Sequence, residues 1–135
     1  MAAITYLLDT NICIYAMRGE YAVLRKFSQH GQESLAISSL VAAELAFGVE
    51  KSKRVEENKR ALELFLQSME VLAWSEAAIW HYAQHRKALK EAGTPIGEID
   101  LLIASHALGD DLTLVTNNTR EFERIGGLKL ENWAQ

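Results

Sequence analysis

The chain has 135 residues, of which 49% are hydrophobic, with only eight glycines and one proline. This composition fits one domain with a substantial core and excludes a disordered or loop-dominated protein. The formal net charge of −4 argues against a strongly basic nucleic-acid-binding protein, although acidic side chains gathered around a cation would count in the same sum.

The cysteine content and the hydropathy pattern bear on the cellular compartment in which the protein is expected. The single Cys13 excludes an internal disulfide framework and suits a reducing environment. We find no basic-then-apolar signal segment at the N-terminus and no apolar run that approaches the length of a membrane span. A cytoplasmic protein is therefore expected.

The first half of the chain is predicted to alternate short strands with helices. The apolar run at 4–8 predicts a buried strand, and the run at 34–38 predicts a second one. Ser38 or Ser39 can cap the helix that follows the second strand. The helices of this half are expected at 11–17, 20–29, 39–51 and 53–69.

The second half continues the same alternation. Its strands are expected at 71–74, 112–116 and 128–132, and its helices at 76–91, 97–108 and, as a short helix or turn, 119–125. Gly93 and Pro95 end the first of these helices. Short apolar strands alternating with helices predict an α/β fold, with a mostly parallel central sheet of about four to five strands covered by helices on both faces. We expect residues 1–135 to form a single domain.

Asp9 follows the first predicted strand directly, in the run YLLDTNICIY. In an open α/β sheet, ligands bind beyond the carboxyl ends of the strands, so Asp9 is a candidate site residue. It could equally cap the helix that follows. Its neighbours Thr10 and Asn11 could hold the Asp9 carboxylate in one orientation, or could be capping and turn residues.

Two further acids lie at unusual positions on predicted helices. Glu44 falls within the apolar arc of its helix, where a buried carboxylate needs a positive or hydrogen-bonding partner; a side chain at the helix edge that reaches water is the alternative. Asp100 also has apolar neighbours on its helix, but it lies in the first turn, where the helix amides favour an anion without any further function.

A second polar cluster follows the strand predicted at 112–116. Thr116 is followed by Asn118, which can offer a neutral oxygen to a cation or to water, and by Glu121, which offers a charged one. As a turn after a strand, this cluster needs no function, because asparagine is a common turn former.

Several carboxylates cannot share a pocket without a cation, because like charges raise one another's pKa. A hard divalent ion resolves this repulsion. Oxygen ligands without a Cys or His pair point to Mg²⁺ or Mn²⁺ rather than to Zn²⁺. Mg²⁺ held by a few carboxylates and several waters is typical of phosphoryl-transfer and nuclease sites.

The segments LLDTN, SSLVAAELAFGVEKS, GTPIGEIDLLIASHAL and LVTNNTREFERI, in this order and spacing, resemble PIN-domain ribonucleases, above all the VapC toxins of bacterial toxin–antitoxin modules. The likeness covers nearly the whole chain and implies a PIN-like fold. It also implies that Asp9, Glu44 and Asp100 form the metal-binding acidic site.

At a fourth position, the chain departs from the family's pattern. Thr116 matches, but Asn118 stands where the pattern has an acid, and Glu121 occupies the second acidic place. The loss of one charge should weaken cation binding, or leave one cation site where two are possible. Glu98 lies outside the core pattern, but it could reach the site through the bend at Gly97 and is kept as a supporting residue.

The resemblance implies a function as well. Such proteins are Mg²⁺-dependent endoribonuclease toxins that cleave structured RNA, often tRNA, with a metal-activated water. They form homodimers and are silenced by a cognate, VapB-like antitoxin.

Because both RNA and this protein carry net negative charge, RNA binding requires local contacts from lysine and arginine side chains. The densest cluster is Lys51, Lys53 and Arg54, and Arg120 lies beside the second polar cluster. The other candidates, most of which fit ordinary solvated helix charges, are Arg18, Lys26, Arg86 and Lys87. Packing or surface roles are expected for His81, His85 and His106, and core or interface roles for Trp74, Trp80 and Trp133.

Two other functions stay open. In an aspartyl-phosphate phosphatase or receiver-type α/β protein, Asp9 would be the phosphorylated nucleophile. The phosphatase requires a second acid two residues later, and both types require a lysine late in the sheet; the sequence offers neither. A catalytically inactive RNA-binding module is the third possibility, supported only by Asn118.

Overall fold

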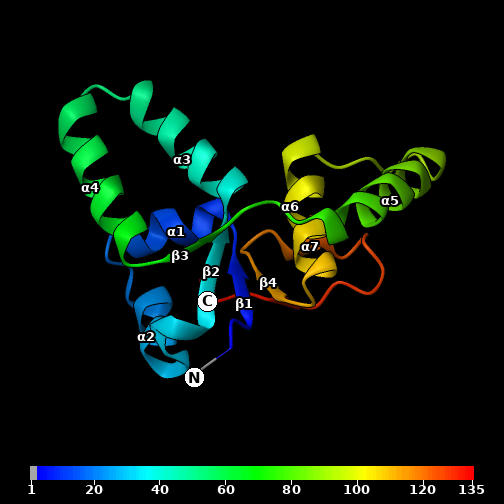
Figure 1. Ribbon diagram of the computed structural model, residues 1–135, viewed down its shortest axis with the longest axis horizontal. Helices are drawn as coiled ribbons and strands as arrows, with labels where there is room; N and C mark the ends of the chain where they lie inside the picture. The colour runs from blue at the N-terminus through cyan, green and yellow to red at the C-terminus, as the bar shows by residue number, and fades with distance from the viewer. Residues whose placement is uncertain (1–2) are drawn as a thin grey trace.

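The computed structural model describes residues 3–135 (Figure 1). Its sheet has five strands, all paired in parallel, in the order β3-β2-β1-β4-β5. The α/β fold and the mostly parallel sheet predicted from the sequence are therefore confirmed. The strands are β1 (Tyr6–Leu8), β2 (Leu35–Ser38), β3 (Glu70–Leu72), β4 (Thr113–Val115) and β5 (Leu130–Glu131).

Helices follow the strands as the alternation predicts. They are α1 (Thr10–Met17), α2 (Tyr21–His30), α3 (Ser39–Glu50), α4 (Val55–Gln67), α5 (Ile79–Glu91), α6 (Glu98–Gly109) and α7 (Thr119–Phe122), with 3₁₀ turns η1 (Gln32–Ser34) and η2 (Glu76–Ala78). The α3–α4 pair and the α5–α6 pair lie on opposite sides of the view in Figure 1, with β1 and β2 drawn between them, and α3 also contacts α6. Among the described residues, none of the helices has the length and apolar character to cross a membrane.

The order of the strands places a switch point between β1 and β4. Leu7 pairs with Leu114 and Leu8 with Val115, so both strands end at the same level. The residues that follow, Asp9 and Thr116, therefore lie side by side at the edge where ligands bind in open α/β sheets.

The core is built from the residues that the apolar runs supply. Leu7, Leu8, Ile37 and Leu114 are fully buried. Trp133 is also buried and stacks on His30 with ring centroids 4.9 Å apart, which confirms its predicted core role. Trp80 is 72% exposed, so a core role for it is wrong, because it lies on the outer face of the first turn of α5.

Helix α6, which carries Asp100, is held by a close backbone approach. A Cβ atom added at Gly109 would lie 2.7 Å from the backbone nitrogen of Ala78 and 2.8 Å from the carbonyl carbon of Ala77. These backbone atoms belong to η2, so any larger side chain at Gly109 would push α6 away from this turn.

The close approach predicts the effect of adding one methyl group. Gly109→Ala should destabilise the fold by about 1–3 kcal/mol through overpacking, measured by chemical denaturation. Gly48→Ala is the matched control, because a Cβ atom there meets no described atom within 4 Å; in the interior of α3 it should stabilise by about 0.5–1 kcal/mol. Equal effects of the two substitutions would contradict the role of Gly109.

Candidate active site

Asp9 serves both as a helix cap and as the centre of a polar site. The Thr10 backbone N–H donates to Asp9 Oδ1 at 2.8 Å, which caps α1. The Thr116 hydroxyl donates to Asp9 Oδ2 at 2.8 Å. Burial raises the pKa of Asp9, these two hydrogen bonds oppose the rise, and the negative charges of Glu44 and Glu121 add to it. The capping and site interpretations of Asp9 are thus compatible.

Glu44 has the hydrogen-bonding partner that its helical position requires. The Thr10 hydroxyl donates to Glu44 Oε1 at 2.7 Å, which links α1 to α3. Thr10 thus orients two carboxylates, Asp9 through its backbone and Glu44 through its side chain. The second contact was not predicted, because it joins residues 34 positions apart in sequence.

Asp100 is the most strongly perturbed acid of the cluster. Its pKa is raised to about 7, first by burial, then by the negative charges of Asp9 and Glu121, by a hydrogen bond with Glu121, and by the charge of Glu44. A Cβ atom on Gly97 would lie 3.4 Å from Asp100 Oδ2, in ordinary van der Waals contact, so the carboxylate lies against the residue that precedes α6. Asp9, Glu44, Asp100 and Glu121 therefore form one interacting cluster, which we call the acidic cluster.

Asn118 holds Glu121 in place. Its side-chain amide donates to Glu121 Oε2 at 2.8 Å, and its backbone N–H donates to the Thr116 hydroxyl at 3.0 Å. The Gly97 N–H donates to the other oxygen of Glu121 at 3.3 Å. Asn118 was predicted to offer an oxygen to a cation or water; here its amide donates to an acid of the cluster.

A chain of amides lies beside the acidic cluster. Asn11 donates to Asn117 Oδ1 at 3.4 Å, and the Asn117 amide donates to the Tyr15 hydroxyl at 2.8 Å. Asn117 belongs to the polar cluster that follows β4, but its contacts with Asn11 and Tyr15 were not predicted from the sequence. The spacing of Asn11 and Tyr15, four residues apart on α1, was the available signal, because residues with this spacing share one helix face.

The acidic cluster fits a divalent cation held largely through water. Within residues 3–135, no group of three or more His, Cys, Asp or Glu side chains is close enough to bind one ion together. Mg²⁺ does not need such a group, because it binds through one or two carboxylates and keeps several waters. Burial and the negative charges of the neighbouring acids raise the pKa values of Asp9 and Asp100, and all the candidate ligands are oxygens.

Comparison with known proteins gives the family. The PIN domain model matches residues 6–128. Ribonuclease VapC2 of Rickettsia felis is 46% identical and covers 95% of this chain and 97% of its own length. The tRNA(fMet)-specific endonuclease VapC of Shigella flexneri is 43% identical, with 96% and 98% covered. The chain belongs to the PIN-domain family, in its VapC group.

Solved VapC structures share the whole fold. The VapBC2 structure from Rickettsia felis, bound to a DNA fragment from its promoter, matches with a TM-score of 0.90 at 42% identity, covering 96% of this chain and 99% of that chain. DNA-bound VapBC from Salmonella typhimurium matches with a TM-score of 0.91 at 39% identity, covering 96% and 98%. The predicted PIN-like fold is confirmed.

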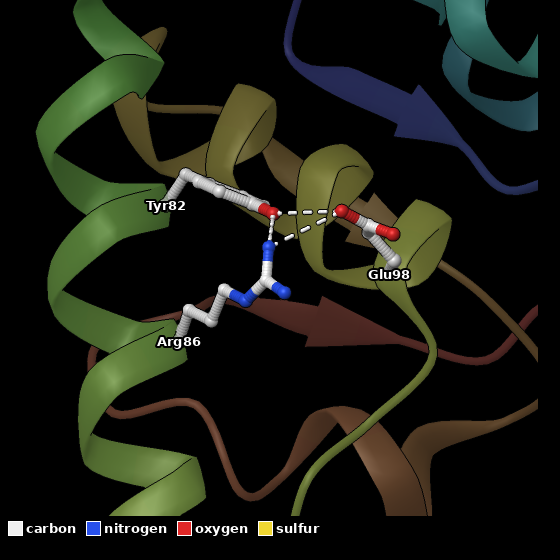
Figure 2. Close-up of polar contacts among 3 residues, drawn as sticks. All are labelled: Tyr82, Arg86 and Glu98. Atoms are coloured by element: carbon white, nitrogen blue, oxygen red, sulfur yellow. Dashed lines mark hydrogen bonds and ion pairs between the residues drawn. The ribbon is translucent and has the colours of Figure 1, made fainter.

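Glu98 differs from its predicted position within this PIN-domain site. Its carboxylate accepts hydrogen bonds from the Tyr82 hydroxyl and from Arg86 Nη1, both at 3.2 Å, and both donors belong to α5 (Figure 2). Glu98 and Asp100 are about 200° apart around the helix axis. The contacts of Glu98 therefore turn it toward α5 and away from the acidic cluster, contrary to the prediction.

The predicted RNA-contacting cations are dispersed. Lys51, Lys53 and Arg54 lie at the turn between α3 and α4, where the Lys51 ammonium lies 5.0 Å from the centre of the Phe47 ring and Arg54 pairs with Glu57. Arg120 is exposed on α7. Their RNA contacts stay a prediction.

The histidines and the remaining tryptophan have the structural places that were expected. His106 is fully buried in α6, with Nε2 at 3.2 Å from Asp110 Oδ2, and burial lowers its pKa. His81 and His85 stack on each other along α5. Trp74 is half-buried and donates to the Leu102 carbonyl at 2.9 Å.

The raised pKa of Asp100 predicts a pH dependence without metal. Between its ordinary value of 3.8 and its folded pKa of about 7, the folded state binds more protons than the unfolded state. The free energy of unfolding should therefore fall as the pH rises from about 4 to about 7. Asp100→Asn should remove this contribution, whereas Asp111→Asn, at an exposed position paired with Lys129, should not. Urea denaturation in EDTA at several pH values between about 4 and about 7 measures the free energy of unfolding. If the unaltered protein, Asp100→Asn and Asp111→Asn show the same dependence on pH, the assignment of this dependence to Asp100 is wrong.

Proposed function

We propose that the chain is a Mg²⁺-dependent endoribonuclease toxin that cleaves structured RNA, with tRNA as the substrate class to test first. The observation that carries the proposal is the acidic cluster. Four carboxylates from four different segments lie near the ends of β1 and β4, and burial, together with the negative charges of the neighbouring acids, raises the pKa values of Asp9 and Asp100. Mn²⁺ is a reasonable substitute ion, because it shares the preference for oxygen ligands.

Each residue of the acidic cluster has a role in this proposal. Asp9 and Asp100 would bind the ion directly, and Glu44 and Glu121 would bind it or position its waters. When bound, Mg²⁺ lowers the pKa of the attacking water and offsets negative charge on the phosphate. Thr10 and Thr116 fix the orientation of Asp9 through hydrogen bonds.

The tRNA assignment rests on the relatives. The Shigella flexneri and Salmonella typhimurium relatives are named tRNA(fMet)-specific endonucleases, at 43% and 40% identity. The acidic cluster can serve any phosphodiester, so the choice of RNA must come from surfaces outside it.

We also propose a VapB-like antitoxin as partner, as in the solved VapBC complexes. A groove of about 520 Å³ between α1, α3 and α4 has Thr10 and Glu44 in its lining. Its other lining residues are mostly apolar and include Ile14, Met17, Leu45, Val49 and Leu62. An apolar segment could occupy this groove and present an Arg side chain to the Glu44 carboxylate, since arginine binds carboxylates strongly.

The same proposal includes a homodimer in the cytoplasm. Trp80 and Ile79, which are 72% and 47% exposed at the start of α5, are the apolar side chains whose contact with a second copy we would examine first. The free, buried Cys13 accords with a reducing compartment.

The two alternative functions have less support. A phosphoryl group on Asp9 would meet the negative charges of Glu44 and Glu121, and no hydrogen bond or ion pair found within residues 3–135 brings a lysine or arginine to Asp9. The inactive binding module was suggested by Asn118 alone, and Asn118 hydrogen-bonds Glu121, a role that is compatible with catalysis.

Metal binding tests the cluster directly. Titration calorimetry with Mn²⁺ should detect binding that Asp100→Asn weakens at least tenfold, about 1.4 kcal/mol, because one direct ligand loses its charge. Asp111→Asn is the control and should bind as the unaltered protein does. Unchanged binding in Asp100→Asn would remove Asp100 from the site.

Growth and RNA cleavage test the toxin function. Expression without antitoxin should arrest growth and produce mapped cuts in total RNA. Asp9→Asn should relieve both, while keeping the Oδ1 acceptor that caps α1. If growth arrest persists with the Asp9→Asn, Glu44→Gln and Asp100→Asn proteins, the catalytic proposal is wrong, because toxicity would then come from binding without cleavage.

A further inference from the structure

A small cavity lies behind the first turn of α6, on the side away from the acidic cluster. It has a volume of about 300 Å³ and lies between α5 and the loop that leads into α6. Two cations, one carboxylate, one phenol and four apolar residues line it: Arg86, Lys90, Glu98, Tyr82, Leu89, Pro95, Ile96 and Leu101. An apolar floor beside cations is the combination that single-stranded nucleic acid uses, with a base on the apolar surface and a phosphate on the cation.

Within residues 3–135, the hydrogen bonds of the Arg86 guanidinium at this cavity all involve one nitrogen. Nη1 makes both hydrogen bonds, to the Tyr82 hydroxyl and to Glu98 Oε1 (Figure 2). A guanidinium has five N–H donors in a planar fork, so Nη2 and Nε can still meet a second acceptor. The Arg86 side chain is 58% exposed, which leaves it open to a ligand from solvent.

The Arg86–Glu98 pair is a weak competitor for such a ligand. The Glu98 side chain is 67% exposed and its oxygen lies 3.2 Å from Nη1, and exposed pairs of this kind contribute little to stability. A phosphate can bind the guanidinium fork with two parallel hydrogen bonds and carries more charge. Replacing Glu98 by phosphate at Arg86 therefore costs little of the fold's stability.

The cavity and the acidic cluster are joined by a single helical turn. Leu101 lines the cavity and is the sequence neighbour of Asp100. The Gly97 N–H, one residue before Glu98, donates to Glu121 of the acidic cluster. An RNA strand that passes around the start of α6 can thus contact the acidic cluster with one phosphate and Arg86 with another.

We propose that Arg86 binds a phosphate of the RNA strand near the one that is cleaved, and that Glu98 competes for the same guanidinium and so lowers RNA affinity. The inference rests on the proposed ribonuclease function and deepens it by naming a substrate contact. It also offers a way for RNA to bind an acidic protein, because the Arg86 side chain lies outside the acidic cluster, on the other side of the first turn of α6.

The test compares two substitutions that are expected to change RNA affinity in opposite directions: Arg86→Ala should weaken binding and Glu98→Gln should strengthen it. RNA affinity is measured by fluorescence anisotropy with labelled unfractionated bacterial tRNA in EDTA, and cleavage of the same RNA is followed in Mg²⁺. Arg86→Ala should raise Kd and KM about three- to tenfold with kcat within about twofold, and should reduce the slope of log affinity against log salt by about one. Glu98→Gln should lower Kd and KM, because it removes the competitor and a negative charge.

Lys87→Ala is the matched control. Lys87 is the next residue of α5, its side chain is 78% exposed, and it pairs with Glu91 at 3.5 Å. This substitution removes one positive charge from the same helix, so it separates a specific contact from a change in net charge. Thermal melting of all the variants checks that each is folded.

Two outcomes would overturn the inference. If Arg86→Ala and Lys87→Ala change Kd equally, the effect is only net charge. If Glu98→Gln weakens RNA binding as Arg86→Ala does, the pair acts by holding α5 against α6. A wild-type protein that neither binds nor cleaves RNA would instead refute the proposed function itself, and with it the contact at Arg86.

Discussion

Repulsion among carboxylates is the constraint on which this site depends. Asp9, Glu44, Asp100 and Glu121 come from four separate segments, and each would be more stable alone in water. The fold holds them together with neutral groups. The Thr10 and Thr116 hydroxyls, backbone amides and the Asn118 side chain donate to the acids and leave their charge in place. The result is a group of oriented carboxylates whose negative charge suits a small divalent cation.

Local sequence patterns were sufficient to predict the fold class and to identify Asp9, Glu44 and Asp100 as candidate site residues. The alternation of short apolar runs with helical segments predicts a parallel sheet, and strand β1 with its following Asp9 is visible within ten residues. Glu44 and Asp100 stand out because each lies among apolar neighbours on its own helix. Such features can be seen from a few adjacent residues, since they depend only on helical and strand periodicity.

Contacts between distant segments could not be seen in this way. The hydroxyl of Thr10 reaches Glu44 on another helix, and the backbone N–H of Gly97 donates to Glu121 on α7. Glu98 was placed in the site because it lies two residues from Asp100, yet that spacing turns it to the opposite face of α6. Helical periodicity alone indicates this direction, whereas the partners of Glu98 on α5, Tyr82 and Arg86, are not contained in any local pattern. The exposure of Trp80 likewise depends on which face of α5 packs against the rest of the fold.

The close approach of Gly109 to the backbone of η2 has a consequence for how this enzyme can evolve. Helix α6 rests against main-chain atoms at this point, and main-chain atoms are present whatever side chains a lineage acquires. The parallel register of β1 and β4 is likewise a property of the backbone. These main-chain contacts form a part of the site's frame that substitutions among core side chains leave in place. A substitution at Gly109, in contrast, changes one of them directly.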